Sequence, residues 1–572
     1  MRKTVALILL ILLTQPIGFA QKQRSLTEDQ RILHVLNRLG FGARPGDVER
    51  VKAMGLENYI NQQLNPEKIT DAAAETKLAE LTTLNMSTAE LYGKFPQPGQ
   101  LLRQLQARGM LPADSEMKSD AAKNNQTQPP GNPLDNEKNR EAIQQYYREN
   151  GLQRPERIIT ELQASRILRA VYSERQLQEV MVDFWTNHFN VFANKGADRW
   201  LLTAYDRDTI RPFALAKFSE LLEATAKSPA MLFYLDNFQS VSPDAGRPGI
   251  FRRQQQPQQR RGINENYARE LMELHTLGVD GGYTQKDVTE VARCFTGWTI
   301  FQPRGGAAAV AAVMPRDGER RNARLGEAMQ RTAGTFFFNP RAHDDGEKIV
   351  LGHKISSGGG MKDGLEVLDI LAHHPSTAKF IATKLVRHFV SDNPPPALVD
   401  RVAATYKKSD GDIREMLKTI FFSKEFNSPE AYRVKIKRPF ELVVSAIRTL
   451  GADTNGGPGT HQWIARMGEP LYGFQTPNGY SDAAESWVNT GGLLERMNFG
   501  LALASNRVQG TKVNLTKTSG DQAKVMDEYL KSILAGDVSP STREALMKQM
   551  NQSDPATKVV GLILGTPEFQ RQ

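Results

Sequence analysis

His188 is the first residue of this sequence whose type and position could support chemistry. On a predicted helix over residues 174–192, His188 shares one face with Leu177, Met181 and Phe184. An imidazole on an apolar face is either a core residue with one or two hydrogen-bond partners, or an acid/base or metal ligand at the bottom of a cleft. A core histidine is the commoner case, and both interpretations stay open here.

A second group of candidates lies on a predicted helix over residues 264–278. Glu265, Arg269 and Glu273 are four residues apart and align on one face, where each ion pair contributes about 0.2–0.5 kcal/mol. Alternatively, Arg269 and Glu270 reach inward to a polar pocket. There the guanidinium would bind a carboxylate, phosphate or sulfate, and the carboxylate would bind a metal or act as a base.

The pair His343-Asp344 has the most functional character of the sequence. It lies in a polar turn with Lys348, between two short apolar segments, where packing does not require a histidine. Imidazole and carboxylate groups from this turn, His188 and Glu270 would suit zinc, manganese or iron if the fold brought them together. The predicted site is catalytic His188, Glu270, His343 and Asp344, substrate-binding Arg269 and Lys348, and His188 and His343 as ligands of a divalent metal.

Two further histidines, His275 and His388, fall near the predicted ends of helices. A positive ring interacts favourably with the C-terminal carbonyls of a helix, which suffices to explain both. The sequence contains no HExxH motif, no Gly-x-Ser-x-Gly motif and no P-loop. A nucleotide cofactor is therefore not expected.

Helices are the elements that must position these residues, because a helical hydrophobic period dominates the chain. We predict an all-α or nearly all-α fold, in one large multi-helix body over residues 21–572. A capping box is predicted at residues 25–28. The predicted helices include 155–172, 174–192, 200–207, 212–226, 361–372, 375–390, 397–407, 413–422, 439–450 and 485–504. The short strand candidates are 336–338 and 348–351, which allow a small β-hairpin near residues 335–352.

Three stretches, near residues 112–139, 239–261 and 303–334, are rich in polar, Gly, Pro or Arg residues and read as surface inserts. The first residues have a different pattern. Arg2 and Lys3 precede an apolar run, and Gly18 and Ala20 provide small residues before Gln21. This is the layout of a signal peptide over residues 1–20. We therefore expect a periplasmic or extracellular protein without a stable membrane anchor after cleavage.

Charge and cysteine content exclude several classes. The formal net charge of +9 falls to +7 once Arg2 and Lys3 are removed, which is modest for 572 residues. A diffuse charge on an exported chain argues against nucleic acid as a partner. The single cysteine, Cys294, excludes an internal disulfide, a Cys-rich zinc site and c-type haem attachment. We expect this thiol to be buried and inert.

Several segments together resemble the bacterial family called domain of unknown function 1800. They occur in the order 34–42, 183–189, 265–278, 283–284, 296–298, 343–344 with Lys348 and 351–352, 374–375 with 388–389, and 477–480 with Trp487 and Asn489. The resemblance implies an exported, helical protein with no established activity. It also implies a possible partner, a second secreted protein that resembles alkaline phosphatases or sulfatases.

Two functions fit these observations. The first is an exported, metal-assisted hydrolase that acts on an anionic or carbohydrate-type substrate of the cell envelope. The second is a non-catalytic envelope protein that binds or helps to mature a secreted partner, in which case the polar motif residues hold helices together. A cleft shared by His188 and His343 favours the first function, and scattered, individually satisfied residues favour the second.

Overall fold

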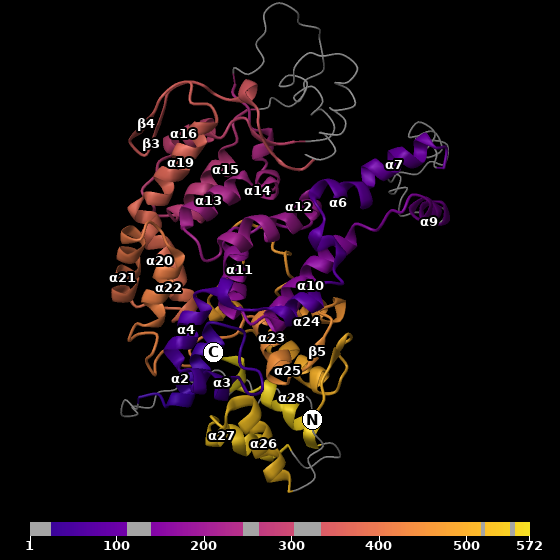
Figure 1. Cartoon of the computed structure of the whole chain (residues 1–572), viewed down its shortest axis with the longest axis vertical. Coiled ribbons are helices and arrows are strands. Elements are labelled where there is room, and N and C mark those ends of the chain that lie inside the picture. The colour runs from indigo at the N-terminus through magenta and orange to yellow at the C-terminus, as the bar shows by residue number, and fades with distance from the viewer. Residues whose placement is uncertain (1–24, 111–138, 244–261, 302–332, 516–520, 550–554) are drawn as a thin grey trace, which may run out of the picture.

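The computed structural model describes residues 25–110, 139–243, 262–301, 333–515, 521–549 and 555–572 (Figure 1). Helices make up nearly all regular structure in these residues, so the predicted all-α class is confirmed. Across the described ranges, no helix has both the length and the apolar character that spanning a bilayer requires. The expected signal peptide lies outside the described residues, as do nearly all residues of the three expected inserts.

The helices follow one another along the whole chain. The first group is α2 (Glu28–Arg38), α3 (Asp47–Met54), α4 (Leu56–Gln63), α5 (Ala72–Leu78), α6 (Thr88–Lys94), α7 (Pro98–Ala107) and α9 (Arg140–Glu149). The second is α10 (Glu156–Tyr172), α11 (Gln176–His188), α12 (Asp198–Ala204), the π-helix η5 (Tyr205–Ile210), α13 (Phe218–Lys227), α14 (Pro229–Tyr234), α15 (Glu265–Glu270), the π-helix η8 (Leu271–Thr276) and α16 (Gln285–Cys294). The third is α19 (Met361–His373), α20 (Pro375–Phe389), α21 (Pro396–Lys408), α22 (Ile413–Phe421), α23 (Pro439–Thr449), α24 (Pro458–Arg466), α25 (Thr490–Ala504), α26 (Gln522–Leu534), α27 (Pro540–Met547), α28 (Pro555–Leu564) and α29 (Pro567–Gln570).

Most of the described buried apolar side chains form one contiguous core that extends from Ile32 to Phe569. A smaller cluster lies under α6, and another joins α7 to α9 in an arm that projects from the body in Figure 1. Cys294 is buried at the end of α16, and burial raises the pKa of its thiol to about 12. The predicted burial of this thiol is confirmed, and its raised pKa favours the protonated form at neutral pH.

Within the described ranges, the strands form three two-stranded antiparallel sheets, β1–β2, β3–β4 and β5–β6. Both predicted segments are strands, β2 (Phe336–Phe338) and β3 (Lys348–Val350), but they do not pair with each other. β2 pairs with β1 (Trp298–Ile300), and β3 forms a hairpin with β4 (His353–Ile355). The residues between β2 and β3 are occupied by a 3₁₀ turn and by the buried His343, which keeps the two strands apart. The third sheet joins β5 (Asp453–Thr454) to β6 (Thr511–Lys512).

Local capping moves several predicted helix boundaries. The first capping box is made by Thr27 and Gln30 rather than by residues 25–28. The helix predicted over 485–504 begins at Thr490, because the Asn489 side chain accepts a hydrogen bond from the backbone N–H of Gly492. The helix predicted over 174–192 ends at His188, and residues 189–192 turn away from it.

A short antiparallel contact joins residues 570–572 to the segment that precedes α23. The backbone N–H of Lys435 donates to the carbonyl of Gln572 at 3.2 Å, and the N–H of Gln572 returns a bond to Lys435 at 2.9 Å. The N–H of Lys437 donates to Gln570 at 2.9 Å. Arg496 bridges both segments, since its guanidinium donates to the Gln570 side chain and to the Lys437 carbonyl. Residues 570–572 and Arg496 thus fix the segment that leads into α23.

Candidate functional site

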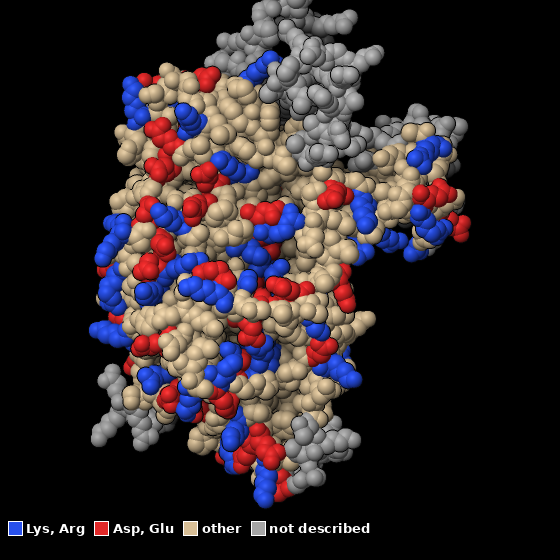
Figure 2. All heavy atoms as spheres, in the orientation of Figure 1, with Lys and Arg blue, Asp and Glu red and all other residues tan. Residues whose placement is uncertain are grey.

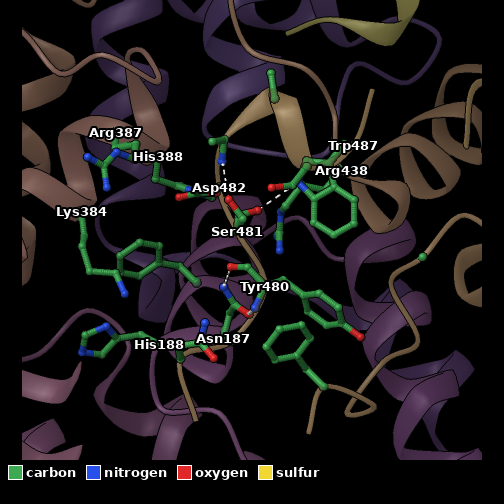
Figure 3. Close-up of a pocket in the computed structure, with 18 of the residues that line it drawn as sticks. Asn187, His188, Lys384, Arg387, His388, Arg438, Tyr480, Ser481, Asp482 and Trp487 are labelled. Atoms are coloured by element: carbon green, nitrogen blue, oxygen red, sulfur yellow. Dashed lines mark hydrogen bonds and ion pairs between the residues drawn. The ribbon is translucent and has the colours of Figure 1, made fainter. Parts of the chain in front are cut away.

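A cavity of about 1350 Å³ opens where α11, α20 and the loop 468–487 meet. The end of α11 contributes Asn187 and His188, and α20 contributes Lys384, Arg387 and His388. Figure 3 shows these two groups with the loop residues around the same space. The cavity exceeds the roughly 300–1,000 Å³ that small-molecule sites usually occupy, so it has room for a sizeable ligand.

One wall of the cavity is a cationic face of α20. Pro375 begins this helix, and its apolar residues at helical spacing face the core. Lys384, Arg387 and His388 are three and four residues apart, which places all three on the face that remains. Among the described residues, neither Lys384 nor Arg387 has a hydrogen-bond or ion-pair partner; Lys384 contacts only the Phe380 ring as a cation, at 5.5 Å.

The other charged groups of the cavity are largely compensated. Nδ1 of His388 lies 3.2 Å from both carboxylate oxygens of Asp482. Asp392 pairs with Lys435, whose ammonium also donates to the Asp482 carbonyl at 2.8 Å. Glu485 is an exposed acid at the cavity. Lys384 and Arg387 therefore stand out as cations without a fixed counter-charge.

Burial and the nearby Arg387 lower the pKa of the Lys384 ammonium to about 8, although Asp482 acts in the opposite direction. Such a lysine still carries its charge at neutral pH, but at a cost that a bound anion would relieve. The outer surface offers no comparable feature on the face drawn in Figure 2, where positive and negative side chains are interspersed. The cavity is the better place to look for an anion.

The opposite wall is the loop 468–487, which α11 holds in place. Nδ2 of Asn187 donates to the carbonyl of Tyr480 at 2.9 Å, and Oδ1 accepts from the N–H of Tyr480 at 2.7 Å. Nδ2 of Asn190 donates to the carbonyls of Phe474 and Thr476, at 3.1 and 2.8 Å. The side chains of Asn187 and Asn190 thus pair with the loop backbone as another backbone segment would, in a loop whose regular structure is limited to the short 3₁₀ helix η10 (Ala484–Ser486).

Aromatic rings give this loop a stiff surface. The rings of Phe474 and Tyr480 are 4.5 Å apart, and those of Tyr480 and Trp487 are 5.9 Å apart. The indole N–H of Trp487 donates to the Ser481 carbonyl at 2.9 Å, and the Tyr480 hydroxyl donates to Pro470 at 2.8 Å. In Figure 3, Tyr480 and Trp487 lie across the cavity from Lys384 and Arg387.

His188 lies at the floor of the cavity and is 2% exposed. Its ring is enclosed by Trp185, Phe189 and Phe380, with ring centroids at 5.4, 4.5 and 6.2 Å. Nε2 lies 3.1 Å from the carbonyl oxygen of His275, whereas Nδ1 is buried without a partner. The π-helix η8 ends one residue after His275, so this carbonyl lacks a donor within the helix.

The surroundings of both histidine rings favour the neutral form. Burial, the Lys384 ammonium and the His275 ring hold the pKa of His188 well below its ordinary value. Burial and Lys384 lower the pKa of His275 to about 3. The expectation that His275 carries a positive charge at a helix end is therefore wrong, because the ring is buried rather than exposed at the terminus.

Buried ion pairs lie beneath the cavity. Arg438 lines it and pairs with Asp183 and with Glu469, the latter at 2.9 Å. Asp183 also accepts from Arg166 at 2.7 Å. These ion pairs connect α10, α11, the start of α23 and the loop 468–487. They therefore hold together the segments on which the cavity is built.

The structure places His343 in a different, closed cluster. Its Nδ1 lies 2.8 Å from the Thr296 carbonyl and its Nε2 lies 3.2 Å from Asp363. Lys348 is 1% exposed and pairs with the same carboxylate at 2.5 Å. Asp344 forms a bidentate pair with Arg293, at 2.9 and 3.0 Å. Within the part of the chain that the structure describes, no hydrogen bond or ion pair connects this cluster to His188.

The remaining predicted residues lie outside the cavity lining. Arg269 donates to Gln285 at 2.6 Å on the outer side of α15. Glu270 is half-buried, and burial together with Glu273 raises the pKa of its carboxyl. The six predicted site residues are therefore not brought together. No group of three or more His, Cys, Asp and Glu side chains suited to a metal ion occurs among the described residues.

Sequence reasoning selected only His188 among the residues of this cavity. It did not select Asn187, Lys384, Arg387, Asp482 or Tyr480. Two signals were present: the spacing of the cations on one helix, and the resemblance motifs, which include Asn187, His388 and Tyr480. Neither signal reveals that a loop nearly 300 residues distant meets α11.

A family model described as "Protein of unknown function (DUF1800)" matches residues 34–571, which is nearly the whole chain. No curated protein and no solved structure matches the chain.

Proposed function

Since the chain belongs to the DUF1800 family, whose description assigns no activity, we propose from the cavity itself that the protein binds an anionic ligand of glycan type. One observation carries this proposal: Lys384 and Arg387 line the cavity with no ion-pair or hydrogen-bond partner among the described residues. Phosphate, sulfate and carboxylate share the chemistry that an ammonium and a guanidinium recognise.

The opposite wall supports the glycan part of the proposal. Tyr480 offers a partly exposed ring, against which the buried Trp487 ring packs, and Thr476, Asn478 and Ser481 offer exposed amide and hydroxyl groups. A sugar presents an apolar ring face edged by hydroxyls, which matches such a wall. The size of the cavity favours a ligand longer than one sugar unit.

The place of action is part of the proposal. We propose that cleavage after Ala20 releases the protein to the periplasm or the extracellular space, where anionic envelope polymers occur. Intact-mass measurement of the protein from its native host tests this, and a retained residue 1 contradicts it. A secreted protein that resembles alkaline phosphatases or sulfatases remains the proposed partner, because it would act on esters of the same anions.

Two uses of the bound ligand are open, hydrolysis and binding alone. The metal-assisted route proposed from the sequence required His188 and His343 in one site, and these residues lie in separate clusters. Binding alone is favoured by the buried network of His343, Lys348 and Asp363. Such a closed network is typical of polar residues that hold structural elements together. Hydrolysis is favoured by His188, whose Nδ1 has no protein partner.

Calorimetric titration of the mature protein with sodium sulfate and with glucose 6-sulfate tests the proposal. Lys384→Met and Arg387→Gln should each weaken binding by about tenfold or more, which corresponds to about 1.4 kcal/mol. Lys379→Met is the matched control, because Lys379 lies on another face of α20 and pairs with Asp400. Glucose 6-sulfate should bind more tightly than sulfate. Absence of binding, or equal binding by all variants, overturns the proposal.

A further inference from the structure

We propose that the amine of Lys384 forms an imine with the carbonyl group of a ligand whose anionic group is held by Arg387. The ligand is then an anionic aldehyde or ketone, such as the open-chain form of an acidic sugar. This inference rests on the proposed function, because the cavity must first bind the anion. It adds a covalent step and gives the two cations different roles.

The Lys384 side chain is accessible from the cavity. It lines the cavity and is only partly buried, and Figure 3 shows its nitrogen on the cavity side of α20. Arg387 lines the same wall three residues later. Residues three apart on a helix have Cβ atoms about 5–6 Å apart, so one small ligand can contact both side chains.

Lys384 differs from two neighbouring lysines in having no carboxylate partner. Lys379, on another face of α20, pairs with Asp400, and Lys435 pairs with Asp392. Such a carboxylate stabilises the protonated ammonium, which has no lone pair with which to react. Among the described residues, the Lys384 nitrogen forms no hydrogen bond or ion pair. Its amine is therefore free to react with a ligand.

The surroundings keep part of this amine neutral. Burial and Arg387 on the same helix lower the pKa of Lys384 to about 8, and Asp482 in the loop acts in the opposite direction. The groups from α11 and η8 that interact with Lys384 are the rings of His188 and His275, which favour the neutral form and add no counter-charge. At pH 7 about a tenth of the amine is therefore unprotonated, which is the form that attacks a carbonyl carbon.

The step needs no further reactant. The nitrogen lone pair of Lys384 forms a bond to the carbonyl carbon, and the carbonyl oxygen takes one proton of the amine. The resulting carbinolamine loses its hydroxyl group and the second amine proton as water, which leaves the imine. Addition of water reverses the step and releases the ligand. Arg387 keeps its charge throughout and holds the anionic group.

Reductive trapping on the intact mature protein tests the proposal. Glyoxylate is an anionic aldehyde, glycolaldehyde is a neutral aldehyde of similar size, and cyanoborohydride reduces an imine to a stable amine. Peptide mass spectrometry should find Lys384 modified by glyoxylate at least about tenfold faster than Lys379, because more of its amine is neutral. With glycolaldehyde, or in Arg387→Gln, this ratio should be at least about threefold smaller, because no charge attraction guides the aldehyde. Sulfate, which competes for Arg387, should slow the modification of Lys384 by glyoxylate.

The outcomes separate this inference from the proposed function. Sulfate binding with Lys384 modified no faster than Lys379 overturns the inference and leaves the binding proposal intact. A ratio that is equal for the two aldehydes, or unchanged in Arg387→Gln, shows that the anion site does not guide the carbonyl, which also overturns the inference. Absence of both sulfate binding and selective Lys384 modification removes the binding proposal and the inference together. The comparison of Lys384 with Lys379 uses the parent protein alone, so it does not depend on the folding of a variant.

Discussion

The side-chain amide of Asn187 pairs with both backbone polar groups of Tyr480, donating to its carbonyl at 2.9 Å and accepting from its N–H at 2.7 Å. This geometry is that of a residue in a β-ladder, supplied by a side chain at the end of α11. It makes the position of the aromatic wall depend on the same helix that carries His188. The aromatic wall and the floor of the cavity are therefore both positioned by α11.

Asn187→Ala should release the loop 468–487. The substitution removes two hydrogen bonds and leaves a backbone N–H and a carbonyl without partners, at a cost of about 1–3 kcal/mol of unfolding free energy. Hydrogen exchange at residues 474–487 should accelerate, and sulfate affinity should fall. Asn478→Ala is the control for the exchange measurement alone, because Asn478 is exposed and accepts only from Thr476. Unchanged exchange in Asn187→Ala contradicts the anchoring role.

Gly479→Ala should lower the free energy of unfolding by more than the positive φ of this residue alone would explain. Gly479 has a φ of 69°, and an added Cβ would lie 2.2 Å from the carbonyl oxygen of Asn187. Gly358→Ala provides the comparison, since its φ is 80° and an added Cβ meets nothing within 4 Å. Gly358→Ala should cost about 1–2 kcal/mol, and Gly479→Ala about 1–3 kcal/mol more through overpacking. Urea unfolding measures both, and equal costs would contradict the close packing.

The affinity for sulfate should decrease in alkaline solution. Burial and Arg387 lower the pKa of Lys384 to about 8, so the lysine loses its charge as the pH rises through that value. Sulfate keeps its own charge there. Affinity should be nearly constant below neutrality and fall by about tenfold per pH unit above pH 8. Titration of Lys384→Met should show a flat profile. A parent profile that is equally flat would exclude Lys384 as the anion ligand.

Asp183→Asn should strongly destabilise the protein. The carboxylate lies between Arg166 and Arg438, whose side chains are 4% and 5% exposed. Removal of one partner from a buried pair typically costs about 3–5 kcal/mol, because a charge is left unpaired. Asp527→Asn, in an exposed pair with Arg543, should change the stability little, because solvent screens that pair. Chemical unfolding measures the free energy of unfolding of both variants. Similar losses would show that the buried ion pairs under the cavity do not stabilise the fold more than an exposed pair does.

His343→Gln should affect stability and leave ligand binding unchanged. Both nitrogens of His343 lie within hydrogen-bonding distance of oxygens in its own cluster, so the substitution disturbs a buried network at a cost of about 1–3 kcal/mol. Sulfate affinity and the metal content of the purified protein, measured by elemental analysis, should equal those of the parent. A metal present in the parent and lost from both His343→Gln and His188→Gln would instead restore the metal site proposed from the sequence.

Helix-level features of this fold could be predicted from the sequence because they depend on local spacing. The helical class, the approximate extent of α19 to α23 and the burial of Cys294 all follow from hydrophobic period and composition. Boundaries were less accurate. Asn489 and Thr27 decide where α25 and α2 begin, and each is one of several polar residues able to cap. Strand partners depended on tertiary contacts, as the separate pairing of β2 and β3 shows.

The candidate site was less predictable for the same reason. His188 was found because it stands alone on an apolar helix face. Lys384 and Arg387 resemble ordinary surface cations in the sequence, and only the fold shows that acids do not pair with them. His343 attracted attention as a histidine in a loop, yet Asp363, the residue that satisfies it, lies on a helix twenty residues later. A local sequence pattern does not show which charged residues of distant segments pair with each other in the fold.

The pairing of residues 570–572 with 435–437 has a consequence for when the cavity becomes functional. A ribosome delivers the chain from its N-terminal end, so α11 and α20 exist long before α28 and α29. The Lys435 ammonium binds the Asp392 carboxylate and the Asp482 carbonyl. The backbone of Lys435 can pair with Gln572 only after that residue has been translated. A nascent chain therefore has the cations but not the finished enclosure. Loss of residues 570–572 should therefore loosen the cavity wall that carries Asp392 and Asp482, even though these residues do not line the cavity themselves.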